Sequence, residues 1–120
     1  MNSEEESVSL GLLKKKMAEF AKEMYWDQFH SPRNLLLALV GEVRELSEIF
    51  QWRGDVLKEL PDWKEEEKQY LRKEVSDVLL YLVRLSDICG IDLGKAALRK
   101  VDPNAIKYPV SKTNFYSEGS

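Results

Sequence analysis

Two pairs of acidic residues share one spacing along the chain and could together bind a metal ion. Glu42 and Glu45 form the first pair, and Glu74 and Asp77 form the second. On a helix, side chains three positions apart lie on the same face. Burying an isolated carboxylate is costly unless it is paired or bound to a cation. Carboxylate oxygens without a nearby histidine select hard cations, so the pattern predicts a site for Mg²⁺, with Mn²⁺ as the alternative.

Both pairs lie on the flank of an apolar helical stripe. At about 100° per residue, Glu42 falls inside the apolar arc of its segment and Glu45 lies just beyond it. Glu74 and Asp77 take the same two angular offsets in their own segment. The matched offsets indicate one shared site, and the alternative is ordinary solvated acids on helix edges. A di-iron oxidase, which uses Glu-x-x-His pairs, is excluded because the single histidine, His30, follows no glutamate at that spacing.

Helices must position these acids, and the first two are predicted from apolar spacing. Apolar residues recur at threes and fours over about residues 9–25, which predicts an amphipathic helix. Ser31 followed by Pro32 is typical of a helix start, with the serine as N-cap. The second helix should run to about Trp52 and end at Gly54, which suits a left-handed position.

The third and fourth helices follow a short loop. Asp62 and Glu65 have the spacing of an acidic capping box, so a long helix should begin there and end near Cys89. Asp92 can cap a short fourth helix. No segment alternates with period two for long enough to form a strand. The predicted fold class is therefore all-α.

The two central helices are too apolar to be covered by a single chain. Residues 35–40 and 78–83 are hydrophobic on every side, and a helix of that kind is buried on every side. One layer of four helices cannot bury both. We therefore expect a four-helix bundle with two long central helices that homo-oligomerisation completes, as a tetramer in preference to a dimer.

Composition sets further limits. The 120 residues fit a single domain over 1–120, with an ordered core at about 9–109 and tails at 1–8 and 110–120. A net charge of −3 argues against a nucleic-acid partner. One cysteine excludes a disulfide framework, and no apolar run is long enough to span a membrane. Without a hydrophobic signal segment, we expect a cytoplasmic protein.

The acidic signature and four further segments together resemble one known family. This family is the MazG-like all-α nucleoside triphosphate pyrophosphatases, in its dCTP pyrophosphatase branch. The segments that carry the resemblance are WDQFH at 26–30, PRNL at 32–35, FQW at 50–52 and K-x-x-x-N-x-x-K-Y-P at 100–109. They occur in the family's order and span nearly the whole predicted core. Arg44 departs from the pattern, because related chains often carry a small residue there.

The resemblance implies a reaction. It implies Mg²⁺-dependent hydrolysis of dCTP, and of 5-modified dCTP, to dCMP and pyrophosphate, with a role in nucleotide-pool sanitation. The implied metal ligands are Glu42, Glu45, Glu74 and Asp77. Glu45 is the acid expected to contact the attacking water as well, and so to be catalytic. The alternatives are the same reaction on dUTP or on a broad set of non-standard nucleotides, and a non-catalytic helical assembly module.

The resemblance also implies residues that bind the nucleoside triphosphate. The residues expected to hold the outer phosphates are Lys100, Asn104, Lys107 and Tyr108. The side chains expected to surround the base are Trp26, His30, Trp52 and Tyr81. Aromatic faces stack on a base irrespective of its identity, and the alternative role for these side chains is ordinary core packing.

Overall fold

Four α-helices and one short 3₁₀ helix make up the described part of the chain, which is residues 7–104 of a computed structural model. The helices are α1 (Leu10–Glu23), η1 (Asp27–Phe29), α2 (Pro32–Gln51), α3 (Glu65–Ile88) and α4 (Leu93–Val101). Residues 7–104 contain no strand, which confirms the all-α prediction. No helix within this range is long and apolar enough to cross a membrane.

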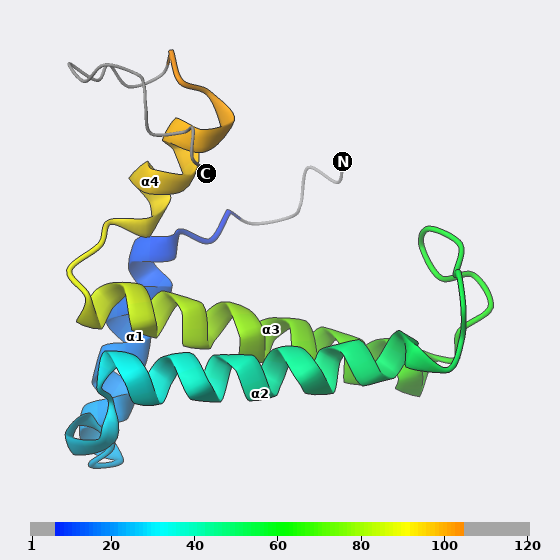
Figure 1. The fold of residues 1–120 in the computed structure, drawn as a ribbon, viewed down its shortest axis with the longest axis horizontal. Helices are drawn as coiled ribbons and strands as arrows, with labels where there is room; N and C mark the ends of the chain where they lie inside the picture. The colour runs from blue at the N-terminus through cyan, green and yellow to red at the C-terminus, as the bar shows by residue number, and fades with distance from the viewer. Residues whose placement is uncertain (1–6, 105–120) are drawn as a thin grey trace.

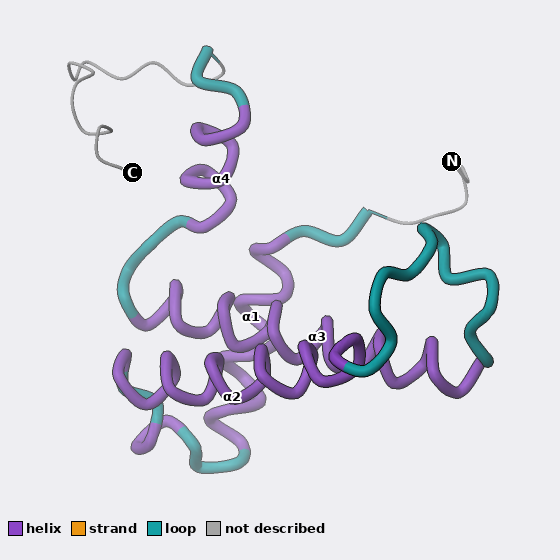
Figure 2. Tube along the Cα trace, turned by 45° about the vertical axis from the view of Figure 1, so that its right-hand side comes forward, coloured by secondary structure: helices purple, strands orange, loops and turns teal. Residues whose placement is uncertain are grey.

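The two long helices form an antiparallel hairpin. Figure 1 shows α2 and α3 side by side, with α1 crossing them at the end where α2 begins and α3 ends. In Figure 2 the two helices stay adjacent from a second direction, and α4 extends away from them. Helix α3 contacts each of the other three α-helices. It is therefore the element around which the chain is organised.

Local signals fix most of the helix ends where the sequence predicts them. The Ser31 hydroxyl accepts a hydrogen bond from the Asn34 amide at 3.1 Å, with Pro32 in the first turn of α2. The Asp92 carboxylate accepts one from the Lys95 amide at 3.0 Å. Such bonds satisfy amide groups that have no partner within the helix. These two N-cap predictions are confirmed.

The predicted start of α3 is wrong. The helix begins at Glu65, and the capping carboxylate is that of Glu67, which accepts a hydrogen bond from the Lys64 amide at 2.8 Å. Glu67 also accepts one from Arg53 at 2.6 Å, so it joins the two ends of the loop. Among the run of acids at the start of the helix, it is Glu67 that caps it, and not the pair Asp62 and Glu65.

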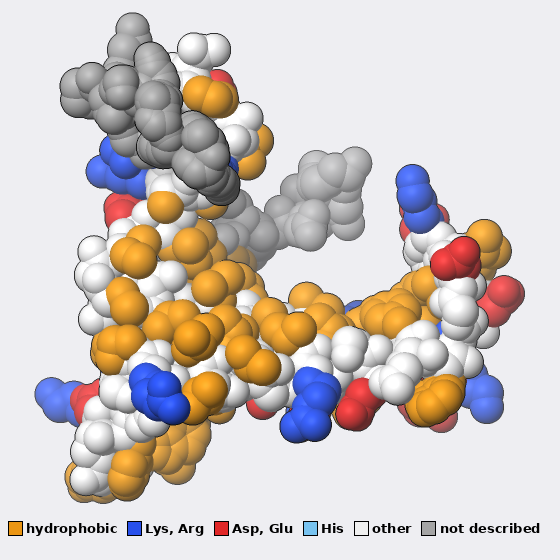
Figure 3. All heavy atoms as spheres, in the orientation of Figure 1, with side chains coloured by type: hydrophobic (Ala, Val, Ile, Leu, Met, Phe, Trp, Pro, Cys, Tyr) orange, Lys and Arg blue, Asp and Glu red, His pale blue; other side chains and the backbone are white. Residues whose placement is uncertain are grey.

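The chain by itself leaves an apolar face of α2 uncovered. Leu36, Leu37, Val40 and Val43 are all exposed, with Val40 57% exposed. Figure 3 shows hydrophobic side chains gathered along the hairpin and over the adjoining end of the molecule. The prediction that these helices are buried on every side therefore does not hold within one chain.

Candidate metal and nucleotide site

Three of the four predicted metal ligands converge between the long helices. Glu42 and Glu45 of α2 and Glu74 of α3 each place one carboxylate oxygen within 4.8 Å of the others. The hairpin brings the flanks of the two apolar stripes together, as the matched angular offsets predict. We call Glu42, Glu45 and Glu74 the acidic trio.

Glu74 is the most buried carboxylate of the trio. It is 1% exposed, and its Oε1 atom has no hydrogen-bond partner within the described residues. Its Oε2 atom accepts a hydrogen bond from the Lys73 ammonium at 3.2 Å. A buried, unpaired carboxylate oxygen is costly to leave without a positive partner. The donor set therefore fits a hard divalent cation held by oxygen ligands.

Asp77, the fourth predicted ligand, lies one helical turn beyond Glu74 and outside the close trio. Its carboxylate lies 3.5 Å from the Lys73 ammonium, so one lysine contacts both of the predicted ligands on α3. Asp77 also lines the cavity described below. It thus stands between the acidic trio and the apolar part of the site.

Electrostatic effects show that the acids interact. Burial, followed by the charges of Glu45, Asp77 and Glu74, raises the pKa of Glu42. Burial and the charges of Glu42 and Asp77 raise the pKa of the Tyr81 hydroxyl. Like charges held close together oppose further ionisation. The site is consequently a concentrated region of negative potential, which favours the binding of cations.

A mostly apolar cavity of about 230 Å³ adjoins the acids. Its walls come from α1, α2, α3 and the turn around η1, and its lining residues are Met17, Phe20, Trp26, His30, Leu35, Asp77, Leu80, Tyr81 and Arg84. The Trp26 ring meets Phe20 edge-on, with ring centroids 5.2 Å apart. Three of the four aromatic residues predicted to surround a base, Trp26, His30 and Tyr81, thus line one cavity.

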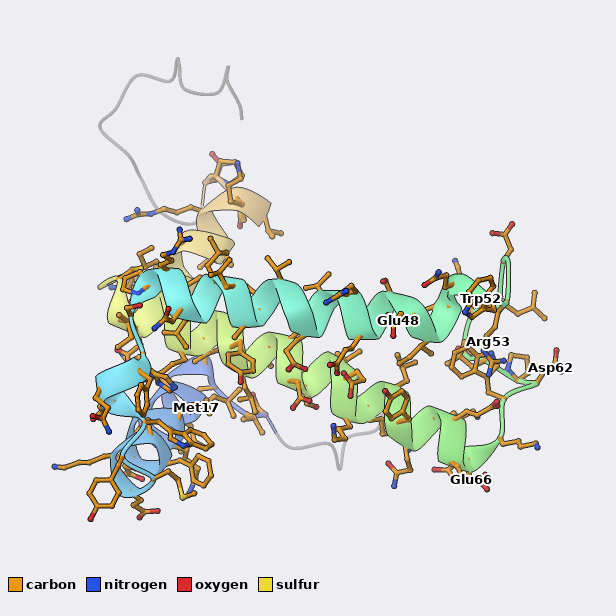
Figure 4. All side chains as sticks on the ribbon, turned by 60° about the horizontal axis from the view of Figure 1, so that its bottom comes forward. Met17, Glu48, Trp52, Arg53, Asp62 and Glu66 are labelled. Atoms are coloured by element: carbon orange, nitrogen blue, oxygen red, sulfur yellow. The ribbon has the colours of Figure 1, made fainter. Side chains whose placement is uncertain are left out.

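Three other predicted binding residues, Trp52, Lys100 and Asn104, are not among the residues that line this cavity. Trp52 caps the far end of α2 and is 85% exposed. It lies 17 residues from the cavity residue Leu35, or about 26 Å along the helix. Figure 4 shows Trp52 and the cavity residue Met17 at opposite ends of the hairpin.

The predicted phosphate-binding residues fall at the C-terminal end of the chain. Lys100 lies in the last turn of α4 and Asn104 just after it, and both are exposed. Lys107 and Tyr108 lie outside the described residues. Their placement against a phosphate is untested.

Several cavity residues were missed at the level of sequence. Met17 and Phe20 belong to the apolar stripe of α1, a pattern that indicates core packing and not a binding site. Arg84 is 4% exposed, although it is charged and lies on the most apolar helical segment. The one signal for it in the sequence is a lone charge inside the run Leu82-Val83-Arg84-Leu85.

Comparisons with known proteins identify the family of the chain. Residues 30–104 match the model of the MazG nucleotide pyrophosphohydrolase domain. The chain is 54% identical over 93 residues to dCTP pyrophosphatase 1 of Rattus norvegicus, covering 78% of this chain and 55% of the rat protein. It is 52% identical over 105 residues to dCTP pyrophosphatase 1 of Homo sapiens, covering 84% of this chain and 62% of the human protein. The chain thus spans less than two thirds of the length of these relatives.

A solved structure supports the same relationship. A pyrophosphatase from Archaeoglobus fulgidus superposes with a TM-score of 0.65 at 33% identity, over 88% of this chain and 97% of that chain. The chain therefore belongs to the family of MazG nucleotide pyrophosphohydrolase domains.

Proposed function

We propose that this chain is a Mg²⁺-dependent nucleoside triphosphate pyrophosphatase that hydrolyses dCTP to dCMP and pyrophosphate. The observation that carries the proposal is the acidic trio beside a cavity with aromatic walls. The base is inferred from the similarity of the chain to dCTP pyrophosphatases. The proposal includes 5-modified dCTP as a substrate and a role in nucleotide-pool sanitation, because an aromatic pocket tolerates a small substituent on a pyrimidine ring.

The acids are assigned their roles from their positions and from how exposed each one is. Glu42, Glu45 and Glu74 would hold a divalent cation, with Asp77 as a further ligand one turn along α3. A cation bound there would neutralise phosphate charge and lower the pKa of a bound water. Glu45 is the exposed member of the trio, so its carboxylate reaches solvent. In this proposal Glu45 would contact the water that attacks the α phosphorus and would accept a proton from it, and pyrophosphate would be the leaving group.

The cavity supplies the base pocket in this proposal. Trp26, His30 and Tyr81 would enclose the ring, and Asp77 would mark the side nearest the metal ligands. Lys100, Asn104, Lys107 and Tyr108 are proposed to hold the outer phosphates. Positioning of this kind accelerates phosphoryl chemistry because the reacting groups are already oriented.

We further propose that the chain self-associates, as a tetramer. The uncovered apolar face of α2 favours this, since contiguous apolar patches on a soluble protein mark interaction sites. A second copy is also a route by which Trp52 could reach a cavity, since it lies far from that of its own chain. Light scattering after size exclusion tests the assembly, and a chain that remains monomeric at micromolar concentration would contradict it.

The experiment for the activity is an assay of pyrophosphate release from a panel of nucleotides, with Mg²⁺ and with a chelator. We expect turnover of dCTP with Mg²⁺ and none with the chelator. Preference for dUTP, or equal rates across the panel, would replace dCTP by one of the alternative substrates. Absence of turnover with every nucleotide would support the non-catalytic assembly module.

A further inference from the structure

Arg84 is a buried cation whose three nitrogens are all occupied by side chains. Its Nη2 donates to Asp27 at 2.6 Å, its Nη1 to Asp87 at 3.3 Å, and its Nε to the Nδ1 atom of His30 at 3.0 Å. Two carboxylates around one guanidinium keep the buried charge paired. Three of its five N–H groups therefore have protein partners, and the bond from Nε lets Arg84 affect a ligand through His30, which it holds in the cavity wall.

The contact with Arg84 determines which ring nitrogen of His30 carries a proton. A nitrogen that accepts a hydrogen bond carries no proton, and a neutral imidazole has one N–H. Nδ1 is therefore the acceptor and Nε2 the donor. Burial, with the Arg84 charge, lowers the pKa of His30, while Asp27 opposes this shift. Within residues 7–104 no protein acceptor pairs with Nε2, so this N–H is available to a ligand.

We propose that Arg84 is a positioning residue that holds His30 as the Nε2–H tautomer, so that the cavity presents one fixed hydrogen-bond donor to an acceptor on the base. This rests on the proposed function. A pyrimidine offers such an acceptor as its O2 carbonyl, and cytosine also offers N3. A rigid donor would reject a ring that turns an N–H toward it, because the two donors would face each other without an acceptor.

The first test needs no substrate, so it is independent of the proposed function. The chain has a single histidine, and long-range ¹H–¹⁵N NMR spectra therefore report on His30 without assignment. Near neutral pH we expect Nε2 protonated and Nδ1 bare in the wild type. In Arg84→Met, His30 faces Asp27 without the competing cation, and Nδ1 should take up a proton at a pH at which the wild type does not. Asp77 and Tyr81, the other titratable groups of the cavity, are present in both variants.

A matched control and a double mutant separate positioning from a structural role. Arg72→Met removes the same charge from an exposed position on the same helix, and it should leave the His30 spectrum unchanged. In the nucleotide assay, Arg84→Met should raise KM for dCTP about three- to tenfold, the range for one lost hydrogen bond, with kcat nearly unchanged. In a His30→Ala background the same substitution should raise KM no further.

Three results would overturn the proposal. The first is a wild-type spectrum with the proton on Nδ1, which holds whether or not any variant folds. The second is an Arg84→Met variant whose His30 signals match the wild type. The third is an additive effect of Arg84→Met on KM in the His30→Ala background, since it would show that Arg84 acts by another route.

Discussion

Replacing Glu74 with glutamine should abolish turnover and make the metal-free chain more stable. The carboxylate is 1% exposed, and its trio partners lie within 4.8 Å. At that separation and an effective dielectric of ~20, each like-charged pair costs about 3 kcal/mol. Glu45 is exposed and Lys73 offsets part of the repulsion, so we expect a net gain of about 1–2 kcal/mol. For a domain of this size, each kcal/mol raises the Tm by about 4–8 °C.

The assay is thermal unfolding with a chelator and with Mg²⁺, at equal chain concentration because assembly also affects the Tm. Wild type should gain stability when Mg²⁺ binds the folded state, and Glu74→Gln should gain less. The matched control is Glu48→Gln, which removes one charge from an exposed position on α2 (labelled in Figure 4). It should leave activity, the metal-free Tm and the Mg²⁺ response unchanged.

A loss of stability in Glu74→Gln would overturn the metal assignment. If metal-free Glu74→Gln melts many degrees below wild type, the carboxylate stabilises the fold through its contact with Lys73. The acidic trio would then be a structural cluster, and its assignment as a metal site would be wrong.

Four further predictions test other parts of the site. Asp77→Asn should lose nearly all activity while its metal-free Tm stays equal to or above that of wild type; a fall of many degrees in unfolding scans would make Asp77 a structural anchor. Lys73→Met should lower the metal-free Tm and raise Mg²⁺ affinity severalfold by titration calorimetry, since the lysine competes with the metal for Glu74; unchanged affinity would contradict this. Trp52→Ala should raise KM by an amount that corresponds to a loss of about 1–3 kcal/mol of binding free energy, the range for base stacking, and kcat should stay unchanged; an unchanged KM would remove Trp52 from the base site. The raised pKa of Glu42 means that the native chain holds this proton more tightly than the unfolded chain. Metal-free stability should therefore fall as the pH rises from 4.5 through the raised pKa. In denaturant titrations at a series of pH values, Glu42→Gln should make this fall in stability with pH less steep. An equally steep fall would show that the pKa of Glu42 is not raised.

Features that depend on local chemistry could be predicted from the sequence. The N-caps Ser31 and Asp92 act on amides within the next turn, so neighbouring residues determine them. The convergence of Glu42, Glu45 and Glu74 followed from helix angles together with an antiparallel hairpin. The prediction of where α3 starts was wrong because three adjacent acids stand in its first turn, and each is a possible cap. The bond between Glu67 and Arg53 joins residues fourteen positions apart, so no local signal indicates it.

Features that depend on distant contacts could not be predicted. The contact of Arg84 with His30 joins residues 54 positions apart, and neither residue type predicts a contact with the other. Helix angles placed Glu74 and Glu42 at the same offset, yet Glu74 alone is nearly inaccessible. The depth of a side chain depends on what packs over it, which is set by the crossing of other helices and not by its own helical face.

In the proposed function the acidic trio serves a metal-dependent cleavage between the α and β phosphates of dCTP. Its most direct test is ³¹P NMR of dCTP during turnover by the intact chain, with Mg²⁺, with a chelator, and with the Glu74→Gln variant. We predict signals of dCMP and pyrophosphate with Mg²⁺ alone, and unchanged dCTP in the other two samples. Formation of dCDP and orthophosphate, or turnover that persists in the chelator, would contradict the claim.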